Sequence, residues 1–260
     1  ILAKIIFLRL FMIPVSVFIV AQDEAHNIER VLHSVKDFAQ VIVVDSGSTD
    51  NTVALAKAAG ATVIHQTWLG YAGHTQFALT QCTCDWVLNL DADEELTTEC
   101  VAVIQDTIVQ AEIAALRLSR NDMFMDKLPN RWVKKPNNLR LYRREQAHFD
   151  TSEQVHETAV VEGNEVRTDI AFTHYGYNRI DALVAKNNLY STLRAEDKFA
   201  RNKRPSLIKL AVVLPLTFIQ KYLLQGRILN GKRGLILATI DAFYAFMKEA
   251  KLWEKYLTKP

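Results

Sequence analysis

Three short apolar runs, each followed by a segment of different periodicity, constrain the fold of this chain most. Residues 15–20, 41–44 and 61–65 are rich in β-branched side chains, as is typical of strands covered on both faces of a sheet. Residues 28–35 carry apolar side chains at helical spacing, and residues 52–59 form a second, small-residue helix. This alternation predicts right-handed crossovers and a parallel sheet of the nucleotide-binding type.

A fourth apolar run, residues 86–90, leads into two carboxylates, Asp91 and Asp93. Side chains at positions i and i+2 of a strand point the same way. Both carboxylates should therefore leave the carboxyl end of this strand together, at the edge where open α/β sheets bind ligands. Such a pair can hold a divalent cation, and the cation can hold a diphosphate. A strand followed by an acidic helix cap is the purely structural alternative.

Asp45 ends the second strand and is followed by Ser-Gly-Ser-Thr. A loop of this kind can present backbone N–H groups and hydroxyls to a nucleotide, while Asp45 accepts a hydrogen bond from a base or ribose. An ordinary strand-to-helix turn with a capping Asp is the alternative. The chain contains neither G-x-x-x-x-G-K-[ST] nor G-x-G-x-x-G, which excludes a P-loop and a dinucleotide fingerprint.

Composition indicates a globular protein with two different surfaces. At 260 residues, the chain can form one α/β domain with an appendage. Three cysteines give no disulfide framework or zinc site and favour a reducing compartment. From residue 198 onward there are 13 Lys/Arg and 3 Asp/Glu, although the net charge of the whole chain is +2. An acidic front therefore precedes a basic, apolar back.

The sequence pattern predicts helices from residue 181 to the end of the chain, which includes the basic, apolar region. Breaks are expected at prolines and glycines: Pro205, Pro215, Gly226, Gly231 and Gly234. Residues 207–219 are almost entirely apolar but too short for a span of about 20 residues. Flanking Lys/Arg and later aromatics are typical of helices that lie in an anionic membrane surface. A helical cap with a solvated basic face is the alternative. Nucleic acid is not expected as a partner, because no recognised module accompanies the charge.

The opening run, residues 1–11, is apolar apart from two cations and passes directly into the first strand. This favours an interfacial or docking segment over a signal peptide.

Taken together, VSVFIV with QDE and NI, then VIVVDSGSTDNT and NLDADE, resemble the inverting family-2 glycosyltransferases of the GT-A fold in order and spacing. LGYAGHTQFAL, RLYRRE, VHE and FTHYGY, with the basic tail, are similar to a narrower branch. That branch is the bacterial lipopolysaccharide core β-glucosyltransferases, which act on inner-core heptose. The resemblance implies a Rossmann-like, mostly parallel α/β sheet with helices on both faces at residues 1–180. A helical, membrane-associating region at residues 181–260 would follow.

The resemblance also implies roles at the nucleotide end of a UDP-sugar donor. Ala21, Asp23 and Asp45 would contact uracil and ribose, and Gln76 sits where family members place a donor-facing polar group. The loop after the first strand reads Ala-Gln-Asp-Glu, where relatives usually have an Asn before the acidic pair. Because Gln22 replaces that Asn, the roles of Asp23 and Glu24 do not follow directly from those of the relatives.

At the diphosphate, the resemblance implies that Asp91 lies near the ribose or metal and that Asp93 binds Mg²⁺ or Mn²⁺. His174 matches a place where GT-A enzymes often supply a further metal ligand; a satisfied structural histidine is the alternative. Arg140 or Arg143 would help to stabilise the charge that develops on the departing UDP.

The acceptor hydroxyl needs a positioned base. Glu157 is the leading candidate, with Glu153 and Asp150 behind it, and an exposed, mixed-charge strand is the alternative.

We therefore expect a metal-dependent glycosyltransferase bound peripherally to the cytoplasmic face of the bacterial inner membrane. It would move glucose from UDP-glucose, with inversion, to a lipid-linked saccharide, the inner-core heptose of lipopolysaccharide. A family-2 transferase with a polyprenyl-phosphate acceptor is one alternative. A nucleotidyltransferase is another, although residues 21–27 lack its Gly-rich basic loop. A non-enzymatic membrane-binding module is disfavoured, because Asp45 occurs together with Asp91 and Asp93.

Overall fold

The computed structural model describes residues 12–150, 158–177 and 179–258. These residues form two compact units. The sheet unit comprises residues 12–121 and 136–174, and the helical unit comprises residues 122–135 and 175–258, within these described ranges. The expected docking segment, residues 1–11, and the candidate bases Glu153 and Glu157 lie outside the described residues.

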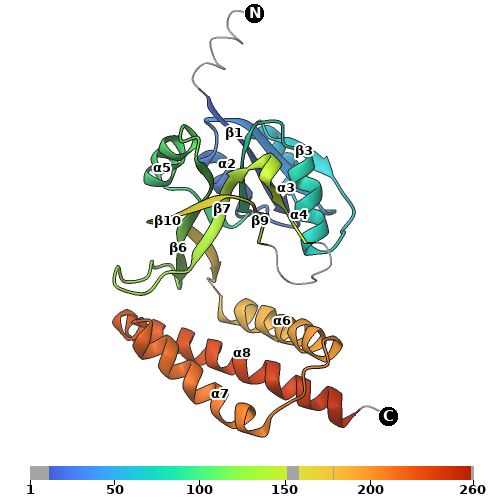
Figure 1. The fold of residues 1–260 in the computed structure, drawn as a ribbon, viewed down its shortest axis with the longest axis vertical. Coiled ribbons are helices and arrows are strands. Elements are labelled where there is room, and N and C mark those ends of the chain that lie inside the picture. Colours follow the sequence, from blue (N-terminus) through green and yellow to red (C-terminus); the bar gives the residue numbers. More distant parts are fainter. Residues whose placement is uncertain (1–11, 151–157, 178, 259–260) are drawn as a thin grey trace, which may run out of the picture. The chain divides into compact units, whose positions relative to one another are not determined.

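A mixed sheet of eight strands organises the sheet unit, in the order β3-β2-β1-β4-β7-β6-β10-β5. Figure 1 labels β1, β3, β6, β7 and β10 of this sheet. Its strands are β1 (Ile13–Ala21), β2 (Phe38–Asp45), β3 (Thr62–His65), β4 (Trp86–Asp91), β5 (Glu94–Glu95), β6 (Ile113–Phe124), β7 (Asn137–Arg143) and β10 (Asn164–Tyr177). A second, two-stranded sheet pairs β8 (Ala147–His148) with β9 (Val160–Val161).

The half of the sheet that contains β3, β2, β1 and β4 is parallel, as the alternating pattern predicted. The other half departs from the prediction of a mostly parallel sheet. There β7 pairs antiparallel with both β4 and β6, and β5 pairs antiparallel with β10. The reason is local: β6 leads to β7 without a crossover helix, and a parallel pairing requires such a crossover.

Helices cover both faces of the parallel half and enclose two separate cores. They are α2 (Ile28–Ser34), α3 (Thr52–Ala58), α4 (Tyr71–Thr80) and α5 (Thr98–Ile108). One core contains residues of α2, α3 and α5, and the other contains residues of α4. Along β1 the buried side chains alternate between these cores, with Val17 and Ile19 in the first and Phe18 in the second.

The register of the parallel strands brings three carboxyl ends to one edge. Ala21, the last residue of β1, lies beside Asp45, the last residue of β2. On the other side of β1, Val20 lies beside Asp91, the last residue of β4. The two acidic motifs that the sequence singled out therefore flank the same strand at the same edge of the sheet.

The helical unit contains α6 (Ile180–Ala200), α7 (Leu207–Ile219), the π-turn η2 (Gln220–Leu224), the 3₁₀ turn η3 (Arg227–Asn230) and α8 (Lys232–Leu257). Pro205 lies between helices, and Gly226 and Gly231 have positive φ at turns, so these expected breaks are confirmed. The breaks expected at Pro215 and Gly234 are wrong. Pro215 lies inside α7, and Gly234 lies in the first turn of α8, where a Cβ atom would come within 1.8 Å of the Arg227 carbonyl oxygen.

Two acidic side chains of α8 hold the basic segments beside it. Glu249 is buried and forms ion pairs with Lys198 of α6 and with Lys209 of α7, the latter at 3.1 Å. Asp241 pairs with Arg227 at 2.9 Å and lies 3.8 Å from Lys221.

Alpha helix α7 and the turn η2 form one exposed apolar segment, Leu207–Leu224, with a mean hydropathy of 1.7. None of this window is buried, and Ile208 and Leu224 are 77% and 78% exposed. Residues 207–219 alone were expected to be too short for a membrane span, but η2 extends the helical segment to 18 residues. By length and composition, this is the one segment of the described residues that could cross a membrane.

Candidate active site

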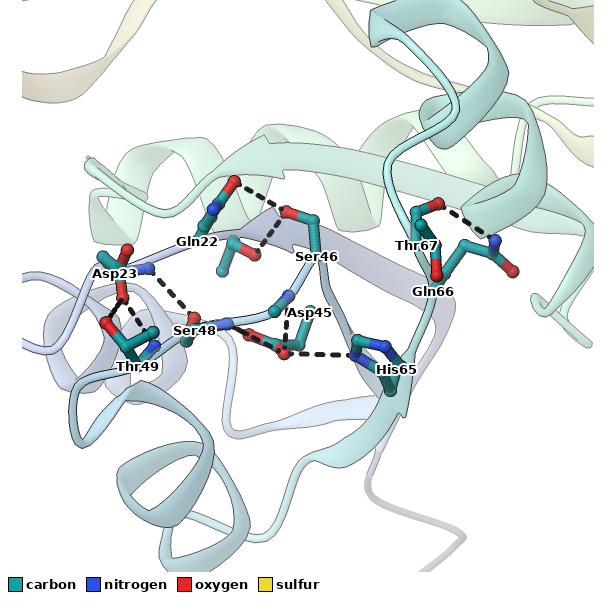
Figure 2. A network of polar contacts seen from close by, with 11 residues as sticks. Gln22, Asp23, Asp45, Ser46, Ser48, Thr49, His65, Gln66 and Thr67 are labelled. Atoms are coloured by element: carbon teal, nitrogen blue, oxygen red, sulfur yellow. Dashed lines mark hydrogen bonds and ion pairs between the residues drawn. The ribbon is translucent and has the colours of Figure 1, made fainter.

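Asp45 is the centre of a polar network at the carboxyl end of β2 (Figure 2). Its carboxylate accepts hydrogen bonds from the N–H groups of Gly47, at 3.0 Å, and Ser48, at 3.2 Å. The Nδ1 atom of His65 lies 3.6 Å from Oδ2. Burial alone would raise the pKa of Asp45, but the hydrogen bonds from Ser48, Gly47 and His65 bring it below its usual value. Asp45 is therefore a charged acceptor at physiological pH.

The loop after β1 is tied to the loop after β2 through Asp23. Asp23 has a φ of 55°, in the left-handed region that Asp tolerates better than most residues. Its N–H donates to Ser48 Oγ at 2.9 Å, and its Oδ1 accepts from the Thr49 N–H at 2.7 Å (Figure 2). One carboxylate oxygen of Asp23 thus holds the loop in shape, a role that the resemblance did not predict.

Ala21 and Asp45 meet through the backbone at the start of this network. The carbonyl oxygen of Ala21 accepts the Ser46 N–H at 3.1 Å. Ser46 Oγ lies 3.3 Å from Gln22 Oε1, so the residue between Ala21 and Asp23 also contacts the second loop (Figure 2). The structure therefore brings together the three residues that were predicted to contact uracil and ribose.

Asp91 and Glu94 share one buried cation, Arg140 of β7. The Arg140 guanidinium lies 3.0 Å from Asp91 Oδ2 and forms a closer ion pair with Glu94 Oε1. Glu94 Oε2 also accepts the Asp91 N–H at 3.0 Å. Burial raises the pKa of Glu94, although the Arg140 guanidinium acts in the opposite direction. Asp91 itself remains largely exposed, with 53% of its side chain accessible.

Asp93 lies on the other side of the turn, against His174 of β10. The Oδ2 atom of Asp93 is 3.3 Å from His174 Nε2, and His174 is almost completely buried. The antiparallel pairing of β5 with β10 places His174 beside Glu94 and so brings its ring to the acidic turn. Carboxylate oxygen and imidazole nitrogen are both ligands that Mn²⁺ and similar ions accept.

The donor chemistry of Asp91, Asp93 and His174 therefore fits a divalent cation. Among the residues that the structure describes, no three His, Cys, Asp or Glu side chains are already gathered as a ligand set. Asp93 and His174 touch, whereas Asp91 is turned to Arg140. Binding a metal through all three would require the Asp91 side chain to exchange its partner.

Arg143 and Gln76 form contacts other than those expected of them. Arg143 pairs with Trp86, at the opposite end of β4 from Asp91, and its side chain bonds the carbonyl oxygen of Ile113 at 2.9 Å. Its proposed contact with the departing diphosphate is wrong for this reason. Gln76 uses its carbonyl oxygen to accept the Phe149 N–H at 2.8 Å, which fixes the segment after β8.

Sequence reasoning missed two histidines near Asp45. His65 follows from the strand pattern as the last residue of β3, but its contact with Asp45 depends on the register of β2 with β3. His74 lies within the LGYAGHTQFAL motif in α4 and is fully buried. No periodicity distinguishes such a buried histidine from its neighbours.

Chemically, one edge of the sheet offers a charged acceptor in a loop of N–H groups and, across β1, an acidic turn with an imidazole. The first suits a nucleoside, and the second suits a metal-bound diphosphate.

Comparisons with known proteins find relatives over most of the chain. Residues 16–162 match the model of Glycosyl transferase family 2. The lipopolysaccharide core biosynthesis glycosyltransferase LpsC of Rhizobium meliloti is 35% identical over 257 residues, covering 95% of this chain and 94% of LpsC. An uncharacterized glycosyltransferase of Rickettsia bellii is 37% identical, covering 92% and 86% of the two chains.

Among solved structures, residues 1–349 of S. aureus TarS in complex with UDP show a likeness of fold. The TM-score is 0.50 at 15% sequence identity, covering 94% of this chain and 91% of that chain.

Proposed function

We propose, for a chain that belongs to glycosyltransferase family 2, the transfer of glucose from UDP-glucose, with inversion, to an inner-core heptose of lipopolysaccharide. The observation that carries this proposal is the meeting of two acidic motifs at one sheet edge. The Asp45 loop lies on one side of the β1 end, and the turn with Asp91 and Asp93 lies on the other. A nucleoside diphosphate sugar has a base, a ribose and a diphosphate to be held in that order.

Asp45 is suited to the nucleoside because its pKa is low and its carboxylate keeps a fixed orientation. Two backbone N–H groups, of Gly47 and Ser48, orient the carboxylate. An ionised carboxylate accepts hydrogen bonds only, so it selects a base or ribose that presents an N–H or O–H.

Asp93 and His174, with Asp91, would hold Mg²⁺ or Mn²⁺ at the diphosphate. When bound, such a cation would neutralise charge that develops on the leaving UDP. Arg140 holds the Asp91 carboxylate at 3.0 Å in this structure, beside the position proposed for the cation. The chain's own contribution is thus to place Asp93 against His174 and to keep Asp91 in the same acidic turn, from which its side chain would have to leave Arg140 to reach the cation.

Glu157 is proposed as the base that accepts the proton of the acceptor hydroxyl. It lies outside the described residues and is proposed because the carboxylate of the VHE motif can accept that proton. Glu157→Gln should abolish transfer and leave UDP binding intact. Retained turnover, or lost UDP binding in a folded variant, would remove Glu157 from this role.

The name of LpsC supports a lipopolysaccharide core acceptor, and the exposed apolar segment Leu207–Leu224 supports access to a lipid-linked one. Its apolar side chains and the surrounding Lys/Arg fit an anionic membrane surface at the cytoplasmic face of the inner membrane. A polyprenyl-phosphate acceptor would use the same segment. Transfer assays with each acceptor separate the two.

Calorimetric titration tests the donor class. UDP, UDP-glucose, CTP and GDP-mannose are titrated into the full chain with Mn²⁺ and, separately, with chelator. We expect metal-dependent binding of UDP and UDP-glucose that Asp93→Ala removes. Binding of CTP alone, or of none of these nucleotides, would refute the proposal and favour the nucleotidyltransferase or non-enzymatic alternatives.

A further inference from the structure

His74 is buried without a partner for either of its ring nitrogens. Its exposed fraction is 0%, and neither Nδ1 nor Nε2 has a hydrogen-bond partner among the residues that the structure describes. A neutral imidazole carries one N–H donor and one acceptor, so both capacities are unused. Buried polar groups are nearly always hydrogen-bonded, because leaving one unpaired destabilises the fold.

The position of His74 links it to the nucleoside end of the site. It belongs to the first turns of α4, which follow β3, and β3 pairs with β2 up to Asp45. Burial lowers the pKa of His74, whereas the carboxylate of Asp45 is close enough to act in the opposite direction. A neutral histidine with unused hydrogen-bonding capacity therefore lies near the proposed nucleoside acceptor.

Trp68 covers this histidine. The indole of Trp68 lies against the imidazole with ring centroids 5.1 Å apart and a tilt of 38°. Tyr71 supports the indole edge-on at 4.9 Å. Trp68 is itself 45% exposed and lies in the segment between β3 and α4. One partly exposed ring, outside any helix or strand, thus packs against the His74 ring.

We propose that His74 is a specificity-determining residue that reads the nucleobase of the donor, and that Trp68 moves aside when the nucleotide binds. An N–H of His74 donates to the O4 carbonyl oxygen of uracil, while Asp45 accepts the N3–H of the same base. Uracil presents this acceptor–donor pair on one edge. Cytosine carries an amino donor at position 4, which cannot accept the His74 N–H, and an unprotonated N3, which the Asp45 carboxylate repels. The inference rests on the proposed use of a uridine nucleotide.

The test compares UDP and CDP affinities of the full chain, in Mn²⁺, for the wild type, His74→Leu and His74→Gln. His33→Leu, on an exposed position of α2, is the matched control. We expect His74→Leu to weaken UDP binding by roughly tenfold or more and to narrow the UDP-to-CDP ratio. His74→Gln, whose amide can still donate, should retain part of the preference.

His74→Leu should not melt below the wild type. Removing a buried polar group that has no partner is neutral or stabilising for the unliganded chain. His74→Leu should therefore keep or raise the melting temperature and lose base selectivity. Loss of a purely structural histidine would not produce these two results together.

An unchanged UDP affinity and ratio in His74→Leu would overturn the inference. Parallel loss of UDP and CDP affinity in both His74 variants would also overturn it, since a general packing defect acts on both nucleotides alike. Absence of UDP binding in the wild type is a different result: it refutes the proposed function itself.

A second measurement does not depend on the His74 variants folding. UDP should change the tryptophan emission of the wild type, and Trp68→Phe should remove that change while UDP still binds. If the emission change is absent in the wild type, or persists in Trp68→Phe, the proposed movement of Trp68 is wrong.

Discussion

The Nε2 atom of His174 lies 3.3 Å from Oδ2 of Asp93. This contact depends on the short antiparallel ladder in which His174 of β10 pairs with Glu94 of β5. A slip of one residue would turn His174 to the other face of the sheet and remove its ring from the acidic turn. The edge that holds the proposed cation is thus fixed by pairing between distant parts of the chain.

His174→Ala should therefore reduce the effect of Mn²⁺ on UDP affinity by about tenfold or more. The remaining carboxylates would still attract the cation but would no longer fix its position. Calorimetry with and without chelator measures this difference, and His148→Ala, at an exposed position of β8, is the control. A folded His174→Ala protein with wild-type metal dependence would show that the histidine is structural.

Arg140→Met should lower the free energy of unfolding by about 3–5 kcal/mol. The substitution leaves Glu94 buried without its cation, next to Asp91. Urea unfolding measures the loss. Adding Glu94→Gln to Arg140→Met should recover part of it, because the amide oxygen can still accept the Asp91 N–H. Equal stability of the single variant and the wild type would contradict the ion-pair arrangement.

Acid should destabilise the wild type through His74. Its folded pKa lies below the usual 6.5, so between the two values the unfolded chain binds more protons than the folded chain. The contribution to stability is complete above about pH 6.5 and falls as the pH drops below it. Urea unfolding at several values across about pH 5–8 gives the free energy of unfolding of the wild type and of His74→Leu. As the pH falls, the wild type should lose more of this free energy than the variant does. Parallel curves would mean that His74 does not titrate in this range.

The exposed segment Leu207–Leu224 should contribute directly to binding of anionic vesicles. Ile208→Asn with Leu224→Asn should weaken this binding several-fold to about tenfold, because each side chain loses apolar area that a lipid interface would cover. Val109→Asn is the matched control, since Val109 is 80% exposed but lies beyond α5 in the sheet unit. Sedimentation with vesicles gives the comparison. Equal loss in the control, or no loss in the double variant, would contradict a role for this segment.

The parallel half of the sheet could be predicted because each of its strands and helices has its own local pattern of apolar residues, as residues 15–20 and 28–35 show. The antiparallel half could not, since it depends on the pairing of β7 with β4, two strands that α5 and β6 separate in the sequence. The position of Arg143 could have been predicted from the alternation of side chains along a strand. It lies three residues after Arg140 on one strand, so the two side chains point to opposite faces. The sequence could not predict that the ring nitrogens of His74 are buried without hydrogen-bond partners in the described part of the chain, because this depends on tertiary packing.

The pairing of Glu249 and Asp241 with four cations of the helical unit has a consequence for how its positive charge acts. Lys198, Lys209, Lys221 and Arg227 are counted among the 13 Lys/Arg of the tail, yet they share two internal carboxylates as counter-ions. The long-range attraction to an anionic surface is therefore weaker than the residue count suggests. Added salt would act twice, by screening that attraction and by loosening the pairs that join α8 to its neighbours.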